Sequence, residues 1–409
     1  HENVYLSNTP PSSINGDEIM GMEDDGIIFE EIEEVDFTDE IFEEVDDQEE
    51  EDEEMEKPED LAALVFDKHD GSVFCCDFHP SGKLAVTGGE DDKAYVWSTE
   101  NGRTIMSCTG HKDSVFFVGF SFDGAYLATV DMSGIIKVWK CRLNDNHQAP
   151  WPIAFEYEAD DLNWALWHFG SRVLICGTMT GDIYVFKIPS GEAKVLKGHT
   201  VRTDCGKVFH DGVRLASGYR DGSLKIWDLK TGTVLHHIPP GTHDIWINAI
   251  DVNPENSLLA SISADGKIGL ITPSNGKVVE QMKTEFDLET IAFSPDPQLG
   301  YFALGALNGS TTIWDTGRKM IRHHCAKSDE DSSSGVTKII WIKDQIVAGC
   351  LDGSLRVYDA KSGERKFVLT GHWSQVLDLC YNAKENIILS TSNDGSARIF
   401  KYTKKSENN

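Results

Sequence analysis

The stretch RDGSLKIWD, at residues 220–228, decides the fold. An Asp-Gly pair that favours a tight turn is followed by a strand of alternating side chains and then by Trp-Asp. Related stretches recur as LNGSTTIWD (307–315), LDGSLRVYD (351–359) and NDGSARIFK (393–401). Weaker copies begin at residues 90, 132, 179 and 264. The chain therefore contains an internal repeat.

The period of this repeat indicates the architecture. Its turn residues lie 41 to 47 residues apart, at Asp91, Ser133, Thr180, Asp221, Asp265, Asn308, Asp352 and Asp394. A period of about 40–45 residues with this turn and an aromatic ending is typical of the four-stranded blades of WD-repeat propellers. Eight copies predict an all-β, eight-bladed WD-repeat β-propeller. In GGEDDKAYVW (88–97), the acidic pair Asp91-Asp92 takes the place of Asp-Gly, so we predict a turn there and not a metal or catalytic site.

Each repeat also carries residues that could form a buried hydrogen-bonded network. A histidine precedes the first strand, a Ser or Thr lies in the second, and the turn Asp and the Trp follow. Burial of such a network is favourable only when nearly every polar group has a hydrogen-bond partner. The most complete sets are His111, Thr129 and Trp139 in one repeat and His199, Ser217, Asp221 and Trp227 in another. We assign these residues a structural role.

The last repeat predicts how the ring closes. It has strand patterns at 376–382, 387–393 and 396–402, but it lacks a fourth, outer strand. Residues 61–66 (LAALVF) precede the first repeat and have nothing else to pair with. We predict that they supply the missing strand and hide an exposed sheet edge. The propeller is then expected over 61–403, as a monomer, with a short tail at 404–409.

Charge divides the chain into two parts. The formal net charge is −31, and residues 1–60 hold 26 Asp and Glu against Lys57 alone. This composition predicts an acidic, largely disordered arm at 1–60. Two interpretations stay open: a solvated tail, or a short docking helix with a polyanion that holds a basic partner. Direct binding to nucleic acid is disfavoured, because the phosphates would be repelled.

The sequence lacks motifs for chemistry. It has no glycine-rich phosphate loop, HExxH, GxSxG or paired zinc-ligand spacing, so we predict no enzyme activity, catalytic residue, cofactor or metal. Nine scattered cysteines without a CxxC pair suit reduced thiols in the cytoplasm or nucleus. No apolar run is long enough for a transmembrane helix. The stretch KSDEDSSSG (327–335) is interpreted as a flexible loop, with phosphorylation of Ser328 as the alternative.

A partner-binding surface is expected on the rim of loops at one face of the ring. These loops lie ahead of each repeat's first strand and around its turn, and they are rich in acids. Two tryptophans that follow repeat histidines suit binding anchors. The candidates are Asp70, Glu90, Asp113, Asp131, Asp160, Asp161, Asp204, Asp244, Trp246, Glu285, Asp287 and Trp373. An acidic rim beside an acidic arm predicts a protein partner with a basic segment, recognised by complementary charge.

Some stretches are more specific than a generic WD repeat. LAVTGGEDDKAYVW (84–97), GHKDSVFFVGFS (110–121), DMSGIIKVW (131–139) and DLNWALWH (161–168) resemble the angio-associated migratory cell protein family, and the likeness covers roughly 60–403. The resemblance implies an eight-bladed propeller. Fungal relatives of this family chaperone a newly made large-subunit ribosomal protein and hold its basic N-terminal segment until 60S assembly. It therefore implies such a ribosomal protein as partner.

The same resemblance implies an alternative function. Animal members are named for endothelial migration and described as cytosolic and cell-surface proteins, which implies a signalling adaptor in cell migration and angiogenesis. Their heparin binding is attributed to a basic N-terminal stretch, which residues 1–60 lack. We expect a cytoplasmic, or also nuclear, protein, and cell-surface association follows from the resemblance alone. The charge distribution favours the chaperone over the adaptor.

Overall fold

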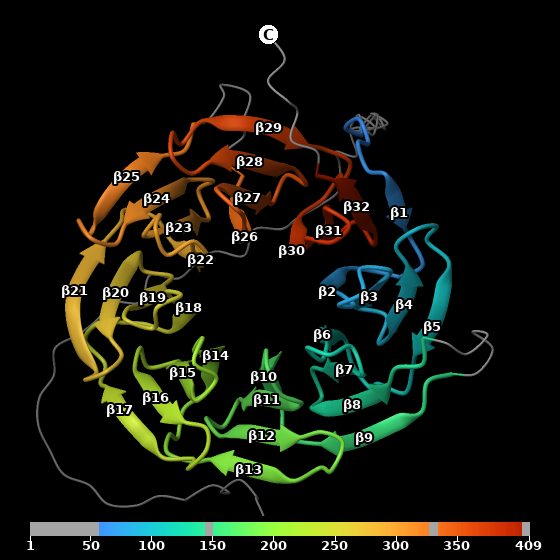
Figure 1. Ribbon diagram of the computed structural model, residues 1–409, viewed down its shortest axis with the longest axis horizontal. Coiled ribbons are helices and arrows are strands. Elements are labelled where there is room, and N and C mark those ends of the chain that lie inside the picture. Colours follow the sequence, from blue (N-terminus) through green and yellow to red (C-terminus); the bar gives the residue numbers. More distant parts are fainter. Residues whose placement is uncertain (1–56, 144–149, 327–333, 403–409) are drawn as a thin grey trace, which may run out of the picture. The chain divides into compact units, whose positions relative to one another are not determined.

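The computed structural model in Figure 1 describes residues 57–143, 150–326 and 334–402. These residues belong to one structural unit, Glu56–Asn409. Their regular secondary structure consists of strands, arranged as eight four-stranded sheets around a ring. The prediction of an eight-bladed propeller is therefore confirmed. The predicted arm up to residue 56, the tail 404–409 and Ser328 lie outside the described residues.

Each of the first seven blades is an antiparallel meander that runs from the centre of the ring outward. Blade 1 comprises β2 (Val73–Phe78), β3 (Leu84–Gly89), β4 (Ala94–Ser98) and β5 (Thr104–Cys108). Blade 2 comprises β6 (Val115–Phe120), β7 (Tyr126–Asp131), β8 (Ile135–Lys140) and β9 (Ile153–Glu158). Blade 3 comprises β10 (Leu162–Trp167), β11 (Val173–Thr178), β12 (Ile183–Lys187) and β13 (Ala193–Leu196). Blade 4 comprises β14 (Thr203–Val208), β15 (Arg214–Tyr219), β16 (Leu224–Asp228) and β17 (Val234–Ile238).

The second half of the ring follows the same pattern. Blade 5 comprises β18 (Ile247–Val252), β19 (Leu259–Ser263), β20 (Lys267–Thr272) and β21 (Lys277–Lys283). Blade 6 comprises β22 (Leu288–Phe293), β23 (Tyr301–Ala306), β24 (Thr311–Asp315) and β25 (Met320–His324). Blade 7 comprises β26 (Val336–Ile342), β27 (Gln345–Cys350), β28 (Leu355–Asp359) and β29 (Arg365–Leu369). Blade 8 comprises β30 (Val376–Asn382), β31 (Ile387–Ser392), β32 (Ala397–Lys401) and β1 (Leu64–Phe66).

Strand β1 therefore supplies the outer strand of the last blade. It pairs antiparallel with β32 over Leu64–Phe66, which is shorter than the expected 61–66. The preceding chain stays close, since Leu61 N donates a 2.9 Å hydrogen bond to Thr370 O. Phe66 is buried and stacks on Trp97 of blade 1, with ring centroids 4.8 Å apart. Backbone pairing and aromatic packing together join the two ends of the ring.

The second strand of each blade is buried along all or nearly all of its length. Strands β3, β7, β27 and β31 contain only buried residues. Because neighbouring blades cover both faces of such a strand, its side chains need not alternate between apolar and polar. This explains continuous runs such as LAVTGG and IILSTS. The outer strand β9 faces solvent and is largely exposed.

The innermost strand of every blade carries a bulge after its first residue. The extra residue has no partner in its own sheet, and a bulge re-aims its side chain. These bulge residues are Phe74, Phe116, Asn163, Asp204, Asn248, Glu289, Thr337 and Leu377. Asn163, Asn248 and Thr337 donate hydrogen bonds of 2.7–3.0 Å to a carbonyl of the next blade. The bulges thus help to fasten adjacent blades.

Carboxylates on the innermost strands fasten the blades in a second way. Asp77 Oδ2 in blade 1 accepts a 2.8 Å hydrogen bond from Phe120 N in blade 2. Asp251 makes the equivalent contact from blade 5 to Phe293 N in blade 6, at 2.7 Å. A typical intramolecular hydrogen bond contributes about 0.5–1.5 kcal/mol. Each such contact therefore resists separation of two blades.

The acidic pair Asp91-Asp92 forms the turn between β3 and β4. Asp92 adopts φ +58°, at the place that Gly222 fills with φ +80° in blade 4. Aspartate tolerates this left-handed conformation better than most side chains. Asp91 Oδ1 lies 2.9 Å from His69 Nδ1, so this carboxylate belongs to a buried network.

Candidate binding site

All predicted partner-binding residues lie at one end of the strands or directly beside it. In an antiparallel meander, the connection to the next blade and the connection between second and third strands leave the sheet at the same end. We call this surface the mouth. It consists of residues 67–72, 90–93, 109–114, 132–134, 159–161, 179–182, 197–202, 220–223, 239–246, 264–266, 284–287, 307–310, 325–326, 334–335, 351–354, 370–375 and 393–396.

The mouth is acidic, whereas the opposite end is mixed. Asp and Glu outnumber Lys and Arg in the mouth, while the described loops at the other end carry both signs about equally. Most of the predicted residues are exposed at the mouth: Asp70, Glu90, Asp113, Asp160, Asp161, Asp244, Glu285, Asp287 and Trp373. Asp244 forms an ion pair with Lys267, whose Nζ lies 2.6 Å from Asp244 Oδ2. The folded ring therefore concentrates negative charge on one face.

Asp131 was wrongly predicted to belong to the binding surface. It is fully buried, its Oδ2 lies 3.0 Å from His111 Nδ1, and its Oδ1 accepts a 2.7 Å hydrogen bond from Ser133 Oγ. Burial alone would raise the pKa of this carboxyl, but its hydrogen bonds with His111, Ser133 and Ile135 N lower it to about 2. In blade 2 the aspartate that pairs with the histidine is Asp131, two residues before the turn position, which Ser133 occupies. Because the repeats were aligned on the turn, the sequence did not reveal this role of Asp131.

Asp204 and Trp246 are only partly accessible, which the sequence did not predict. Asp204 Oδ1 accepts a 2.5 Å hydrogen bond from Arg202 Nε and a 3.2 Å bond from Asn163 Nδ2. Its Oδ2 is buried without a hydrogen-bond partner in the described part of the chain. The guanidinium carbon of Arg220 lies 4.2 Å from the centre of the Trp246 ring. Arginine side chains of the protein itself thus contact both Asp204 and Trp246.

The structure brings together the predicted network of blade 2. His111 Nε2 lies 2.8 Å from Thr129 Oγ1, which also accepts a 3.1 Å hydrogen bond from Trp139 Nε1. All three side chains are buried, and Asp131 completes the chain of contacts. This network holds the loop that carries Asp113 against the core of the blade. The backbone of this loop is therefore held in place, and the exposed Asp113 carboxylate extends from it.

The predicted network of blade 4 is divided into two halves, so that prediction is wrong. Trp227 Nε1 donates a 2.9 Å hydrogen bond to Ser217 Oγ, but Ser217 Oγ then donates to the hydroxyl of Tyr219 at 3.1 Å. His199 Nε2 lies 3.0 Å from Asp221 Oδ2, and the His199 ring packs 4.2 Å from the ring of Tyr219. The bulky Tyr219 separates His199 from Ser217.

Three further networks were not singled out from the sequence. In each, a histidine Nε2 lies 2.8–2.9 Å from the hydroxyl of a Ser or Thr eighteen residues later. The pairs are His69 with Thr87, His243 with Ser261, and His372 with Ser390. This spacing is a sequence signal for such pairs, although His199 and Ser217 share it and are separated by Tyr219. Burial lowers the pKa of His243 to about 4, so its ring is neutral at neutral pH.

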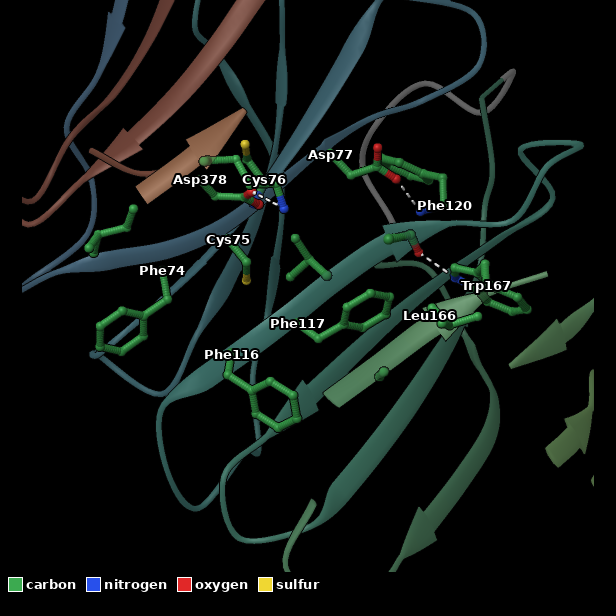
Figure 2. A pocket seen from close by; sticks show the side chains of 15 residues that line it. Phe74, Cys75, Cys76, Asp77, Phe116, Phe117, Phe120, Leu166, Trp167 and Asp378 are labelled. Carbon is green, nitrogen blue, oxygen red and sulfur yellow. Dashed lines mark hydrogen bonds and ion pairs between the residues drawn. The ribbon is translucent and has the colours of Figure 1, made fainter. Parts of the chain in front are cut away.

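A cavity of about 520 Å3 lies among the innermost strands of blades 1, 2, 3, 7 and 8 (Figure 2). The apolar bulge residues Phe74, Phe116 and Leu377 line it. Asp77 and Asp378 complete the wall, and both accept hydrogen bonds from backbone N–H groups. Desolvation raises the pKa of Asp77 to about 7. The hydrogen bonds from the backbone N–H groups of Phe120 and Phe78 lower this pKa, and the nearby Asp378 raises it. Lys338 also lines the cavity, and its Nζ lies 3.3 Å from Asp378 Oδ1, so the wall combines apolar rings with charged groups.

The described residues offer little for catalysis. No group of three or more His, Cys, Asp or Glu side chains among them could hold a metal ion. Burial raises the pKa of the Cys75 and Cys76 thiols well above its usual value, which makes them poor nucleophiles. The same residues include no helix with the length and apolar character needed to cross a membrane. What the mouth offers is a rigid, charged and partly aromatic surface for binding.

Comparison with known proteins places the chain among relatives of the same fold. The WD domain, G-beta repeat, matches residues 63–98, 102–140, 191–228 and 363–401. The angio-associated migratory cell protein of Homo sapiens is 35% identical over 366 residues, which cover 84% of this chain and 80% of the human protein. The chain belongs to the angio-associated migratory cell protein family. The predicted resemblance is therefore confirmed.

The chain also resembles fungal proteins. The ribosome assembly protein SQT1 of Saccharomyces cerevisiae is 26% identical over 346 residues, covering 76% of this chain and 78% of the yeast protein. A crystal structure of Chaetomium thermophilum Sqt1, bound to the N-terminus of the ribosomal protein L10, aligns with a TM-score of 0.76 at 22% identity. The alignment covers 84% of this chain and all of that one, which establishes a shared fold.

Proposed function

We propose that this protein escorts a newly made large-subunit ribosomal protein and holds its basic segment at the mouth until 60S assembly. The observation that carries the proposal is the uneven charge of the propeller. Exposed carboxylates gather at the mouth, from Asp70 in blade 1 to Asp287 in blade 6, whereas the opposite loops are mixed. The action is binding without turnover, by a monomer in the cytoplasm or nucleus.

Charge complementarity gives this binding its physical basis. Carboxylates lining one face raise the local concentration of a cationic segment and speed its capture. In blades 1, 2, 5 and 8 the buried histidine networks hold the backbone of the mouth loops, so little conformational entropy is lost there on binding. The escorted segment would in turn be shielded from other polyanions, above all RNA, until it is released. Masking of charge is therefore sufficient for the role, and no chemical step is needed.

The relatives support the same proposal. The yeast relative is named a ribosome assembly protein, and the Chaetomium thermophilum structure holds the N-terminus of ribosomal protein L10. These proteins share the fold of this chain over most of its length. We propose that a basic segment of the corresponding ribosomal protein meets Asp160, Asp161, Glu285 and Asp287.

Fluorescence anisotropy with a labelled peptide tests the proposal. The probe is the N-terminal segment of ribosomal protein L10, and its control is the same peptide with each Lys and Arg replaced by Gln. We expect binding of the basic peptide only, with an affinity that falls steeply as salt is raised. Equal binding of the two peptides, or an affinity insensitive to salt, would contradict an escort that works by charge. Capture of nascent chains followed by mass spectrometry should enrich one ribosomal protein.

An adaptor for signalling in cell migration is the second candidate. Apolar side chains are also exposed at the mouth, namely Met132, Met179, Phe286 and Leu307. A partner that is not basic could use these side chains, because exposed apolar surface drives association without charge. Partners that bind equally well at low and high salt would favour the adaptor. Recovery of membrane or cytoskeletal proteins without a ribosomal protein would point the same way.

A further inference from the structure

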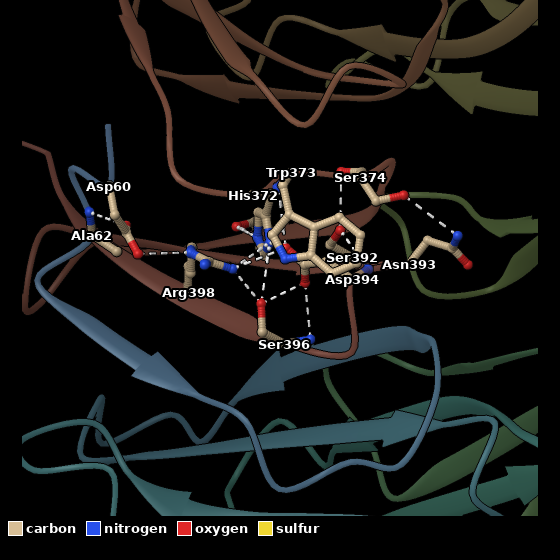
Figure 3. A network of polar contacts seen from close by, with 11 residues as sticks. Asp60, Ala62, His372, Trp373, Ser374, Ser392, Asn393, Asp394, Ser396 and Arg398 are labelled. Atoms are coloured by element: carbon tan, nitrogen blue, oxygen red, sulfur yellow. Dashed lines mark hydrogen bonds and ion pairs between the residues drawn. The ribbon is translucent and has the colours of Figure 1, made fainter. Parts of the chain in front are cut away.

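Trp373 presents an exposed ring from a fixed backbone. The residue is 49% exposed at the mouth, in the loop between β29 and β30. The preceding residue, His372, is buried and lies 2.9 Å from Asp394 Oδ2 and 2.8 Å from Ser390 Oγ. Trp373 N also donates a 3.3 Å hydrogen bond to Asp394 Oδ2 (Figure 3). The indole therefore projects from a loop whose backbone is held by the His372 network.

A cation of the chain itself already covers this ring. Lys57 Nζ lies 5.6 Å from the centroid of Trp373, which is within the range of a cation–π contact. Lys57 is the one basic residue in the acidic stretch 1–60. Arg220 covers Trp246 in the same way at 4.2 Å. The mouth thus places a positive side chain on an aromatic face at two separate tryptophans.

The segment that delivers Lys57 is pinned to the last blade. Glu59 O accepts a 2.7 Å hydrogen bond from Thr370 Oγ1, and Asp60 Oδ2 lies 3.2 Å from Arg398 Nε (Figure 3). Pro58 fixes its own φ and restricts the residue before it to an extended conformation. Lys57 is therefore held close to Trp373 by its neighbours in the chain, at a high effective concentration.

We propose that Trp373 is the subsite for a Lys or Arg side chain of the basic partner, and that Lys57 occupies it in the free protein. This inference rests on the proposed function and names one contact within it. An aromatic face in an acidic surrounding selects a cation over a neutral side chain. Because Lys57 is tethered, the partner's cation must displace it, and the apparent affinity falls by the fraction of molecules in which the subsite is filled.

The test measures binding of the L10 N-terminal peptide to the full chain and to three variants, Lys57→Gln, Trp373→Ala and the double variant. Without its competitor, Lys57→Gln should bind about two- to five-fold tighter, as expected for an exposed cation–π contact. Trp373→Ala should bind about ten-fold weaker, as is common for a tryptophan at the centre of an interface. In the Trp373→Ala background, Lys57→Gln should have no further effect beyond its change of charge.

Lys93→Gln is the matched control, because Lys93 is exposed at the mouth and its loss changes the net charge equally. It should tighten binding less than Lys57→Gln, and by the same factor whether residue 373 is Trp or Ala. Equal effects of Lys57→Gln and Lys93→Gln in both backgrounds would refute the subsite, while salt-dependent binding would leave the proposed escort function standing. Failure of the wild-type chain to bind the peptide would instead reject the proposed function and the subsite with it.

Discussion

Asp378 in the last blade accepts a 3.1 Å hydrogen bond from the backbone N–H of Cys76 in the first blade. This contact spans the junction at which the two ends of the chain close the ring. At the mouth, Ser72 Oγ donates a 2.6 Å hydrogen bond to Asn393 Oδ1 across the same junction. Together with β1 on β32, these contacts make the closure continuous from the centre to the outer edge. These contacts therefore add to the stability of the closed ring.

We therefore predict that Phe66→Ala opens this junction. Phe66 is buried in β1 and stacks on Trp97, so its loss leaves a cavity between the first and last blades. Removing such a ring lowers the free energy of unfolding by about 3–5 kcal/mol. Urea denaturation followed by tryptophan fluorescence measures this change.

Val65→Ala is the control for this prediction. Val65 lies on the same strand but points to solvent, with 41% of its surface exposed. Its replacement should change the free energy of unfolding by less than about 0.5 kcal/mol. Similar effects of the two substitutions would show that β1 does not carry the closure.

A second prediction concerns the network of blade 2. Thr129→Val keeps the shape of the side chain but removes the hydroxyl that meets His111 Nε2 and Trp139 Nε1. Two buried polar groups then lose a partner, at about 1–3 kcal/mol for each group. The thermal unfolding midpoint should fall accordingly, whereas Thr104→Val on the exposed outer strand β5 should leave it almost unchanged. An unchanged midpoint for Thr129→Val would mean that water replaces the hydroxyl.

The buried acids of these networks predict how stability depends on pH. In the folded protein the pKa of Asp131 is about 2, below its usual 3.8, so below pH 4 the unfolded chain binds more protons than the folded one. The stabilising contribution of Asp131 is therefore complete above about pH 4 and is lost as the pH falls toward 2. His243, whose pKa falls from 6.5 to about 4, adds a loss that begins below pH 6.5.

Unfolding midpoints in urea between pH 7 and pH 2 test this dependence. The Asp131→Asn variant should be less stable at pH 5 but should lose less stability between pH 4 and pH 2 than the wild type. Asp113→Asn, an exposed substitution at the same mouth, should follow the wild-type curve. Parallel curves for wild type and Asp131→Asn would show that the carboxyl does not titrate as the structure implies.

The sequence predicted the fold well because the fold depends on local periodicity. Turn pairs, alternating strands and an aromatic ending recur in every blade, and each is readable without tertiary contacts. The side-chain networks were harder to predict, because one neighbouring side chain decides whether they form. Tyr219 divides the network of blade 4, whereas the corresponding Asp131 joins the network of blade 2. Both residues occupy the same position at the end of the second strand.

The binding surface shows where prediction from sequence ends. Loop position placed most acidic candidates together at one end of the strands, because the connectivity of a meander fixes it. Exposure was not predictable, since Asp131 is buried and Asp204 is held by Arg202 and Asn163. The bulge residues that line the central cavity were also missed, because a bulge leaves no signature in a single sequence. Lys57 could not be assigned to Trp373, more than 300 residues away, without the closed ring.

The last prediction separates the charge of the mouth from the charge of the whole protein. Asp160→Lys with Asp161→Lys reverses two exposed carboxylates between β9 and β10. At low salt we expect association with the basic peptide to slow by about ten-fold, because steering depends on the field at the binding face. Glu100→Lys with Glu364→Lys makes the same change of net charge at the opposite end of the strands, away from the mouth. Stopped-flow fluorescence should show a much smaller effect for this pair, and both effects should shrink as salt is raised. Equal slowing by the two pairs would mean that overall charge, rather than the mouth, captures the partner.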